Sequence, residues 1–153
     1  MHVSGLFLYP VKSLRGFAVP AVEIDDLGFA GDRRFLVIDE TGKFLTQRQV
    51  TRMALVSTTL ANGTLTLSAD GAGSVSLPTA SDPAAPLHPV AVWKSEGLLA
   101  EDCGPAAAAW RTRSWRKRRG TSWSSSSARA WARRRKLGWR GTTWPCSTAG
   151  WRR

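Results

Sequence analysis

The stretch Tyr9-Pro10-Val11-Lys12-Ser13-Leu14-Arg15-Gly16 marks the point where the first predicted strand ends and the chain turns. The apolar residues 3–9 predict that strand, and it stops at Pro10 because proline has no N–H for a sheet ladder. A lysine and a serine follow, and Gly16 allows the backbone to turn. The end of a strand therefore presents an ammonium group and a hydroxyl group that can bind phosphate, although a solvated turn has the same composition.

Short segments of β type continue along the chain to about residue 93. Residues 33–39 have a continuous apolar centre, which predicts a strand buried on both faces. Asn62-Gly63 is a hairpin signal, and the alternating residues 64–68 follow it directly. Seven or eight such strands, followed by a helix signal near residues 104–112, predict a mainly β fold. We expect a small antiparallel β-barrel with one short helix.

Positive charge is concentrated at the C-terminal end of the chain. The formal net charge is +11, but residues 111–153 hold 14 of the 22 Lys and Arg residues and none of the 11 acidic residues. The same residues hold six of the eight tryptophans, and Leu137 is their only aliphatic residue larger than alanine. Such a segment buries too little apolar surface to offset the entropy of ordering its backbone. We predict a β-barrel domain over residues 1–110 and a disordered or weakly helical basic tail over residues 111–153.

Two explanations fit this tail. A functional arm would bind phosphates through its cationic side chains and would stack or insert its indoles. Translation out of frame in a GC-rich gene also yields runs of Arg, Trp, Ser and Gly without an apolar period. The composition changes abruptly after Trp110, inside a helix that has just begun. We favour a frameshift or truncation, because a genuine basic arm rarely starts within a folding helix.

The sequence has no pattern of a disulfide framework, a metal site or a membrane span. Cys103 and Cys146 lack CxxC spacing and a nearby histidine, and His2 and His88 lie in contexts with no catalytic pattern. No apolar run approaches the roughly 20 residues of a membrane helix, and the N-terminus does not resemble a signal peptide. We therefore expect a cytoplasmic protein with no metal ligands and no catalytic residues of its own.

Four motifs occur in order along the first 110 residues. They are residues 9–13 (YPVKS), 31–39 (GDRRFLVID), 46–49 (TQRQ) and 101–104 (EDCG). Together they resemble the N-terminal β-barrel domain of MOSC-domain proteins, a family that includes the amidoxime-reducing components and the molybdenum cofactor sulfurases. The resemblance covers about residues 3–110, and four motifs in register are more specific than any one of them.

The resemblance implies a cofactor and a set of residues that bind it. In such proteins the barrel packs beside a MOSC domain, and the molybdenum cofactor (molybdopterin) lies between the two. Lys12 and Ser13 would then hold the pterin phosphate, and Arg33 would contact the same anionic end. A phosphate with a charge of roughly −2 is well matched by an ammonium, a hydroxyl and a guanidinium fork.

The same residues also have a purely structural interpretation. Arg33 or Arg34 can pair with Asp32, Asp39 or Glu40 on the surface, where an ion pair contributes little. Thr46 and Gln49 can order a solvated loop that carries Arg48. Both interpretations stay open on the sequence alone.

The resemblance stops where the MOSC domain should begin, after Trp110. That domain supplies the cysteine that ligates molybdenum, and Cys103 does not correspond to it. We therefore expect half a cofactor site that does not retain the cofactor and does not catalyse a reaction alone. The intact relatives would reduce N-hydroxylated substrates with electrons from partner proteins, or would handle cofactor sulfur. The alternative function is a small β-barrel whose Arg/Trp-rich tail binds nucleic acid or anionic surfaces.

Overall fold

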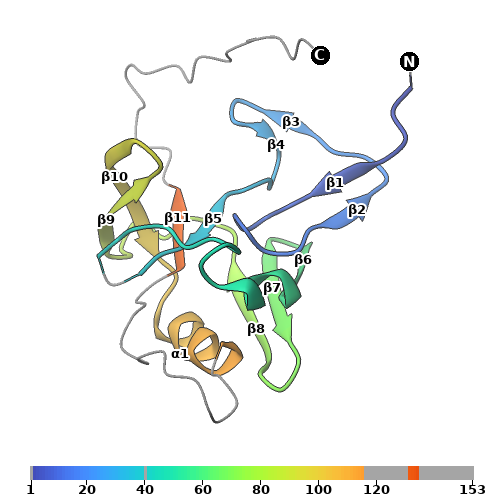
Figure 1. Cartoon of the computed structure of the whole chain (residues 1–153). Helices are drawn as coiled ribbons and strands as arrows, with labels where there is room; N and C mark the ends of the chain where they lie inside the picture. The colour runs from blue at the N-terminus through green and yellow to red at the C-terminus, as the bar shows by residue number, and fades with distance from the viewer. Residues whose placement is uncertain (1, 40, 116–130, 135–153) are drawn as a thin grey trace, which may run out of the picture.

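The structure is a computed structural model that describes residues 2–39, 41–115 and 131–134. Within these residues the chain forms eleven short β-strands, one α-helix and one 3-10 helix, η1 (Figure 1). No helix in this part of the chain is long and apolar enough to cross a lipid bilayer. In chain order the elements are β1 (Leu6–Leu8), β2 (Phe17–Val19), β3 (Ile24–Asp25), β4 (Gly28–Phe29), β5 (Phe35–Val37), η1 (Thr51–Leu55), β6 (Ser57–Ala61), β7 (Thr64–Ala69), β8 (Gly73–Pro78), β9 (Leu87–Val92), β10 (Ser95–Asp102), α1 (Pro105–Ser114) and β11 (Trp131–Arg134).

The strands form four antiparallel sheets, the largest with the order β5-β11-β10-β9. Strands β6, β7 and β8 form a meander, while β1 pairs with β2 and β3 with β4. Isolated parallel bridges join Val11 to Phe35 and Lys43 to Ala91, and they tie loop segments to the largest sheet. The predicted mainly β fold with one helix is confirmed, although the ladders of the described residues do not close into one hydrogen-bonded barrel.

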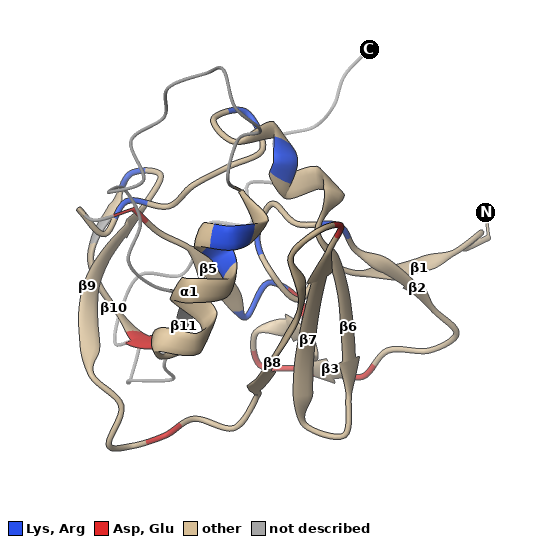
Figure 2. Ribbon diagram, turned by 90° about the horizontal axis from the view of Figure 1, so that it is seen from below, with Lys and Arg blue, Asp and Glu red and all other residues tan. Residues whose placement is uncertain are grey.

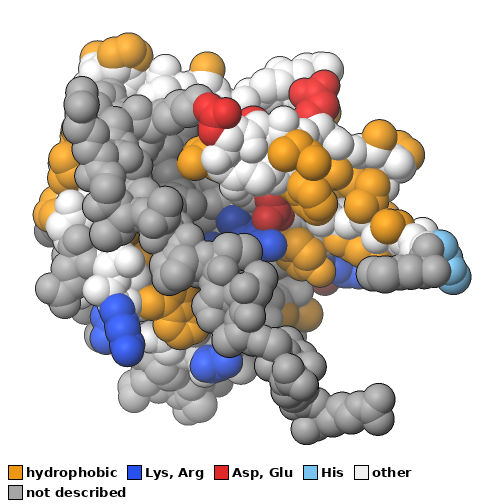
Figure 3. Space-filling model, turned by 90° about the horizontal axis from the view of Figure 1, so that it is seen from above, with side chains coloured by type: hydrophobic (Ala, Val, Ile, Leu, Met, Phe, Trp, Pro, Cys, Tyr) orange, Lys and Arg blue, Asp and Glu red, His pale blue; other side chains and the backbone are white. Residues whose placement is uncertain are grey.

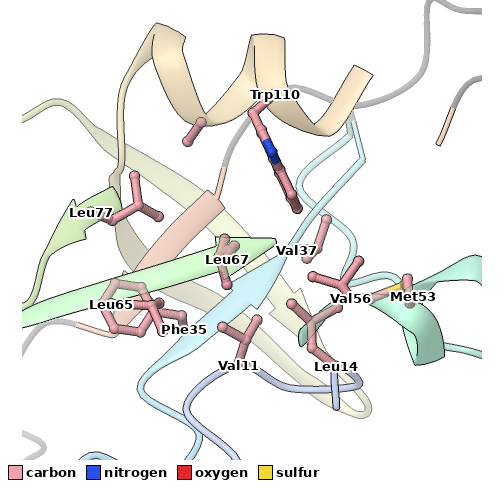
Figure 4. Packing of buried hydrophobic residues seen from close by; sticks show 11 residues of the cluster. Val11, Leu14, Phe35, Val37, Met53, Val56, Leu65, Leu67, Leu77 and Trp110 are labelled. Carbon is pink, nitrogen blue, oxygen red and sulfur yellow. The ribbon is translucent and has the colours of Figure 1, made fainter. Parts of the chain in front are cut away.

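Strand β5 separates two groups of buried side chains. Phe35 and Val37 belong to the larger group, and Leu36 and Ile38 belong to the smaller one. Adjacent residues of a strand point to opposite faces, so β5 buries both of its faces, as its continuous apolar sequence predicts. Figure 4 shows side chains of the larger group, which consists of Val11, Leu14, Phe35, Val37, Met53, Val56, Leu65, Leu67, Leu77, Ala107 and Trp110.

Helix α1 covers the open side of the larger group. The Trp110 side chain points from the helix into this group (Figure 4) and is fully buried, and its Nε1 donates a hydrogen bond to the Gly73 carbonyl oxygen at 3.1 Å. The helix was predicted near residues 104–112 and runs over Pro105–Ser114, with Pro105 in its first turn. The abrupt change in composition after Trp110 therefore falls inside one continuous helix, whose last turn carries basic residues (Figure 2).

Four strands were not predicted. The glycine-containing loop at residues 25–32 holds the small β3–β4 hairpin, in which Gly28 has a φ of 103°. Strand β10 lacks a regular apolar pattern and contains Gly97, and it forms because it pairs along its length with β9. In the tail, which we expected to be disordered or weakly helical, β11 pairs with β5 on one side and β10 on the other. Backbone pairing on both edges needs no apolar side chains, and the rest of the tail beyond residue 115 lies outside the described residues.

Large apolar side chains are exposed on the small hairpins. Phe7 of β1, Ile24 of β3 and Phe29 of β4 are 57%, 77% and 41% exposed. Figure 3, which views the molecule from the side where these hairpins lie, shows apolar side chains in orange on that face. A group of exposed apolar side chains of this kind is typical of a surface that contacts another protein segment.

We predict that Trp110→Ala lowers the free energy of unfolding by about 3–5 kcal/mol, because the change empties a packed site and removes a hydrogen bond. Urea unfolding measures the effect. As a control, Leu55→Ala removes a side chain that is 70% exposed, and the expected change is within about 0.5 kcal/mol. Similar losses in both variants would contradict the central place of Trp110 in the core.

Candidate functional site

The loop between β1 and β2 is anchored by buried residues on both sides of Lys12 and Ser13. Val11 and Leu14 are 0% and 2% exposed, while Lys12 and Ser13 between them are half-buried. The loop ends at Gly16, where a larger residue would not fit, because a Cβ there would lie 2.6 Å from the Tyr9 ring. The backbone that carries these two polar side chains is therefore held in place by its neighbours and is not a free turn.

The backbone of this loop pairs with the segment that leads into β5. The Arg33 N–H donates to the Tyr9 carbonyl oxygen at 2.7 Å, and the Phe35 N–H donates to that of Pro10 at 3.1 Å. The Lys12 N–H in turn donates to the Phe35 carbonyl oxygen at 2.8 Å. These three hydrogen bonds place Lys12 and Arg33 on adjacent segments at the same end of two strands. The structure thus sets the backbone segments that carry Lys12 and Arg33 side by side, and Ser13 follows Lys12 in the same loop.

Asp32 connects the same two segments through its side chain. Its Oδ1 accepts a hydrogen bond from the Tyr9 N–H at 2.8 Å, and its Oδ2 accepts one from Arg33 Nε at 2.7 Å. The Asp32 side chain is 13% exposed, whereas that of Arg33 is 67% exposed. The surface pair considered for Arg33 is therefore present. It orients the guanidinium while most of that side chain remains in contact with solvent.

Arg34 has a different environment from Arg33. One nitrogen of its guanidinium, Nη2, lies 2.7 Å from both carboxylate oxygens of Asp25, and it also donates to the Phe29 carbonyl oxygen at 3.2 Å. These contacts join β5 to the β3–β4 hairpin. Of the two adjacent arginines, Arg33 is thus the one that lies beside the β1–β2 loop.

The ammonium of Lys12 lies over two aromatic rings. Its Nζ is 4.4 Å from the ring centroid of Phe44 and 4.8 Å from that of Trp93, and the two centroids are 5.2 Å apart. Burial lowers the pKa of Lys12 below 10.5, and the positive charges of Arg33 and Arg48 lower it further. Positive charge at this point is therefore unfavourable until an anion offsets it.

Backbone strain is concentrated around the same lysine. Among the described residues other than glycine, four have a positive φ, and three of them are Ser13 at 64°, Arg33 at 48° and Trp93 at 58°. The fourth, Asn62 at 49°, is in the β6–β7 hairpin turn, where asparagine is expected. Left-handed backbone at bulky residues is uncommon, and such residues cluster at functional sites.

Sequence reasoning missed the aromatic part of the site. Phe44 and Trp93 were assigned only to strands, because nothing local shows that two such distant residues meet at Lys12. Trp93 gave no usable signal, because the two-residue turn that it forms with Lys94 between β9 and β10 contains neither the glycine nor the asparagine that usually marks such a turn. The structural interpretation of the neighbouring loop is confirmed, because Gln49 Oε1 accepts hydrogen bonds from the N–H and the hydroxyl of Thr46, both at 2.9 Å.

Other polar groups and hollows of the described residues lie apart from this cluster. One surface hollow, about 630 Å³, is lined by the flanks of the β1–β2 loop and by residues of η1 and β6, and neither Lys12 nor Arg33 lines it. No group of three or more His, Cys, Asp or Glu side chains in the described part of the chain gathers as a metal site. Cys103, beside the helix start, is half-buried and packs against the larger core group.

Comparison with known proteins places this geometry in a wider context. The family model of the MOSC N-terminal beta barrel domain matches residues 1–118. Mitochondrial amidoxime reducing component 2 of Bos taurus is 39% identical over 114 residues, which cover 72% of this chain and 34% of that protein. Mitochondrial amidoxime-reducing component 1 of Homo sapiens is 37% identical over the same shares of both chains. The chain therefore spans about a third of the length of these relatives.

Two further similarities extend the comparison. Molybdenum cofactor sulfurase of Botryotinia fuckeliana is 34% identical over 71% of this chain and 14% of that protein. A protein of Bordetella bronchiseptica with a known solution structure matches with a TM-score of 0.54 and 21% identity, over 84% of this chain and 98% of that one. At this level of identity the second match supports the fold alone.

We predict that the stability of the wild type relative to a Lys12→Met variant rises with pH. The pKa of Lys12 is lower in the folded chain than in the unfolded chain, so between the two values the unfolded state binds more protons. Folding of the wild type therefore becomes more favourable as pH rises through this window towards 10.5. Urea unfolding of both proteins over a pH series measures the difference. An Arg33→Gln change should raise the pKa of Lys12 in the folded chain and so narrow the pH range over which stability rises. If the stability of the wild type relative to Lys12→Met falls with rising pH, the lowered pKa of Lys12 is contradicted.

Proposed function

Since the chain belongs to the family of MOSC N-terminal beta barrel domains, we propose that it forms the phosphate-binding half of a molybdenum-cofactor site. The observation that carries this proposal is the pairing of the end of β1 with the start of β5, which sets Lys12 beside Arg33. The negative charge of a phosphate group held between the two side chains would be offset by the positive charge of both.

The residues present fit the phosphate end of such a cofactor. Lys12 offers an ammonium, Ser13 a hydroxyl and Arg33 a guanidinium, and a phosphate accepts hydrogen bonds from each of these groups. Burial and then the positive charges of Arg33 and Arg48 lower the pKa of Lys12, and a bound dianion would offset the repulsion among these three cations. The cofactor would supply molybdenum for redox or sulfur chemistry, and this chain would bind and orient its anionic end.

We propose that the rest of the pocket belongs to a separate MOSC domain. The relatives to which this chain is similar are about three times its matched length, which leaves room for such a domain in them. The exposed apolar side chains of the β1–β2 and β3–β4 hairpins offer a surface on which it can pack. The 153 residues alone would then not catalyse a reaction.

The activity of the complete protein would be one of two kinds. Two relatives are named as amidoxime reducing components and one as a molybdenum cofactor sulfurase. We accordingly propose either reduction of N-hydroxylated substrates, with electrons supplied by a partner protein, or transfer of cofactor sulfur. Both activities use a cofactor whose phosphate end must be held, so the proposal for Lys12, Ser13 and Arg33 does not depend on the choice.

We also propose that the residues after Trp110 are read out of frame. The family match ends at residue 118, close to the point after Trp110 where the composition changes. Sequencing the coding DNA across codons 105–115 tests this idea. A one-base shift should restore a downstream frame with an apolar period, and a shifted frame without such a period would overturn the idea.

We predict that Lys12→Ala and Arg33→Ala each lower molybdenum occupancy. Residues 1–115, which include all of α1, would be joined in frame to the MOSC domain of a relative and expressed with the cofactor. The molybdenum bound to the fusion protein would then be measured. Loss of a charge-assisted hydrogen bond to phosphate should weaken binding by about tenfold or more.

Arg113→Ala is the matched control for this experiment. Arg113 is exposed near the end of α1, so the variant removes an equal charge away from the proposed site. Occupancy should stay at the wild-type level in this variant. Equal occupancy in all four proteins would contradict the proposed function.

A further inference from the structure

The turn between β9 and β10 has an unusual residue at its first position. Val92 and Ser95 pair across the hairpin, so Trp93 and Lys94 form a two-residue turn. Trp93 has a φ of 58°, a conformation that glycine adopts easily and that a large side chain adopts only under strain. Its side chain is nevertheless 62% exposed, so burial of the indole does not account for the strain.

The strained turn places the indole beside Lys12 and Phe44. The Phe44 and Trp93 rings are tilted by 51°, and the Lys12 ammonium lies within 5 Å of both centroids, at 4.4 and 4.8 Å. The electron-rich faces of aromatic rings attract a cation at such distances. A flexible lysine chain therefore has a preferred position, which the rings define.

Phe44 is itself fixed by the backbone beneath it. The Phe44 N–H donates to the Ala91 carbonyl oxygen at 3.3 Å, and the Ala91 N–H donates to that of Gly42 at 3.0 Å. Gly42 has a φ of 82°, and a Cβ there would lie 2.3 Å from the Pro89 carbonyl oxygen. The segment before Phe44 thus lies directly on β9. Because Phe44 is 8% exposed and belongs to the smaller core group, it is a rigid support for the more exposed Trp93.

We propose that Trp93 is the positioning residue for Lys12, holding the ammonium on the side of the β1–β2 loop where the phosphate would bind. This inference rests on the proposed function, and it assigns to the β9–β10 turn a task that the motifs of the sequence do not include. The indole does not contact the anion in this account. It reduces the freedom that Lys12 must lose when the anion binds, which raises affinity through preorganisation.

Phosphate binding to the full chain tests the proposal, with inorganic phosphate as the probe and NMR chemical shifts of the lysine side chains as the readout. Trp93→Gly should weaken phosphate binding by about fivefold, as expected for the loss of a cation–π contact. The same variant should keep or raise the melting temperature, because glycine relieves the strained turn. Trp93→Phe, which retains an aromatic face, should bind phosphate within about twofold of the wild type.

Asn62→Gly is the matched control, since it introduces glycine at another positive-φ turn away from Lys12. Its phosphate affinity should equal that of the wild type. If Lys12→Ala weakens binding but Trp93→Gly does not, the positioning role is overturned and the proposed function stands. If the wild type binds no phosphate, or binds it equally well without Lys12, the proposed function is overturned and the inference fails with it.

Discussion

The parallel pairing between the end of β1 and the start of β5 is the constraint on which the rest of the site depends. Three backbone hydrogen bonds join residues 9–12 to residues 33–35, and Asp32 adds a side-chain bond across the same junction. Strand β5 cannot shift, because both of its faces are buried in core groups. The β1–β2 loop cannot shift either, because Val11 and Leu14 are buried on either side of Lys12. Packing of the core therefore fixes the backbone positions of Lys12 and Arg33.

Charge at this junction opposes the stability of the fold. Lys12 is partly buried and lies close enough to Arg33 and Arg48 for its pKa to be lowered. Within the described part of the chain, Asp32 pairs with Arg33. Folding tolerates this repulsion because the two aromatic rings stabilise the ammonium and the strands hold the backbone. A concentration of unfavourable charge and strained backbone in one place favours the proposed binding site over a solvated turn.

Local sequence accounts for much of the fold but only part of the site. The buried apolar run of β5, the Asn62-Gly63 hairpin and the proline at the start of α1 each specify their own structure, because the relevant interactions lie within a few residues. Strand β10 was not predicted because it is stabilised by pairing with β9, and its own sequence has no strand pattern. The roles of Phe44 and Trp93 depend likewise on contacts between distant segments, which no spacing along the chain reveals. Lys12 and Arg33 could be predicted because they lie in motifs of a recognisable family. That their segments lie side by side is visible only in the structure.

The most direct measurement is a crystal structure of the full chain grown with inorganic phosphate. The account predicts a phosphate between Lys12 Nζ and the Arg33 guanidinium, with Trp93 still packed beside the lysine. A structure in which these two cationic groups face different ends of the molecule, or in which phosphate binds only elsewhere, would contradict it.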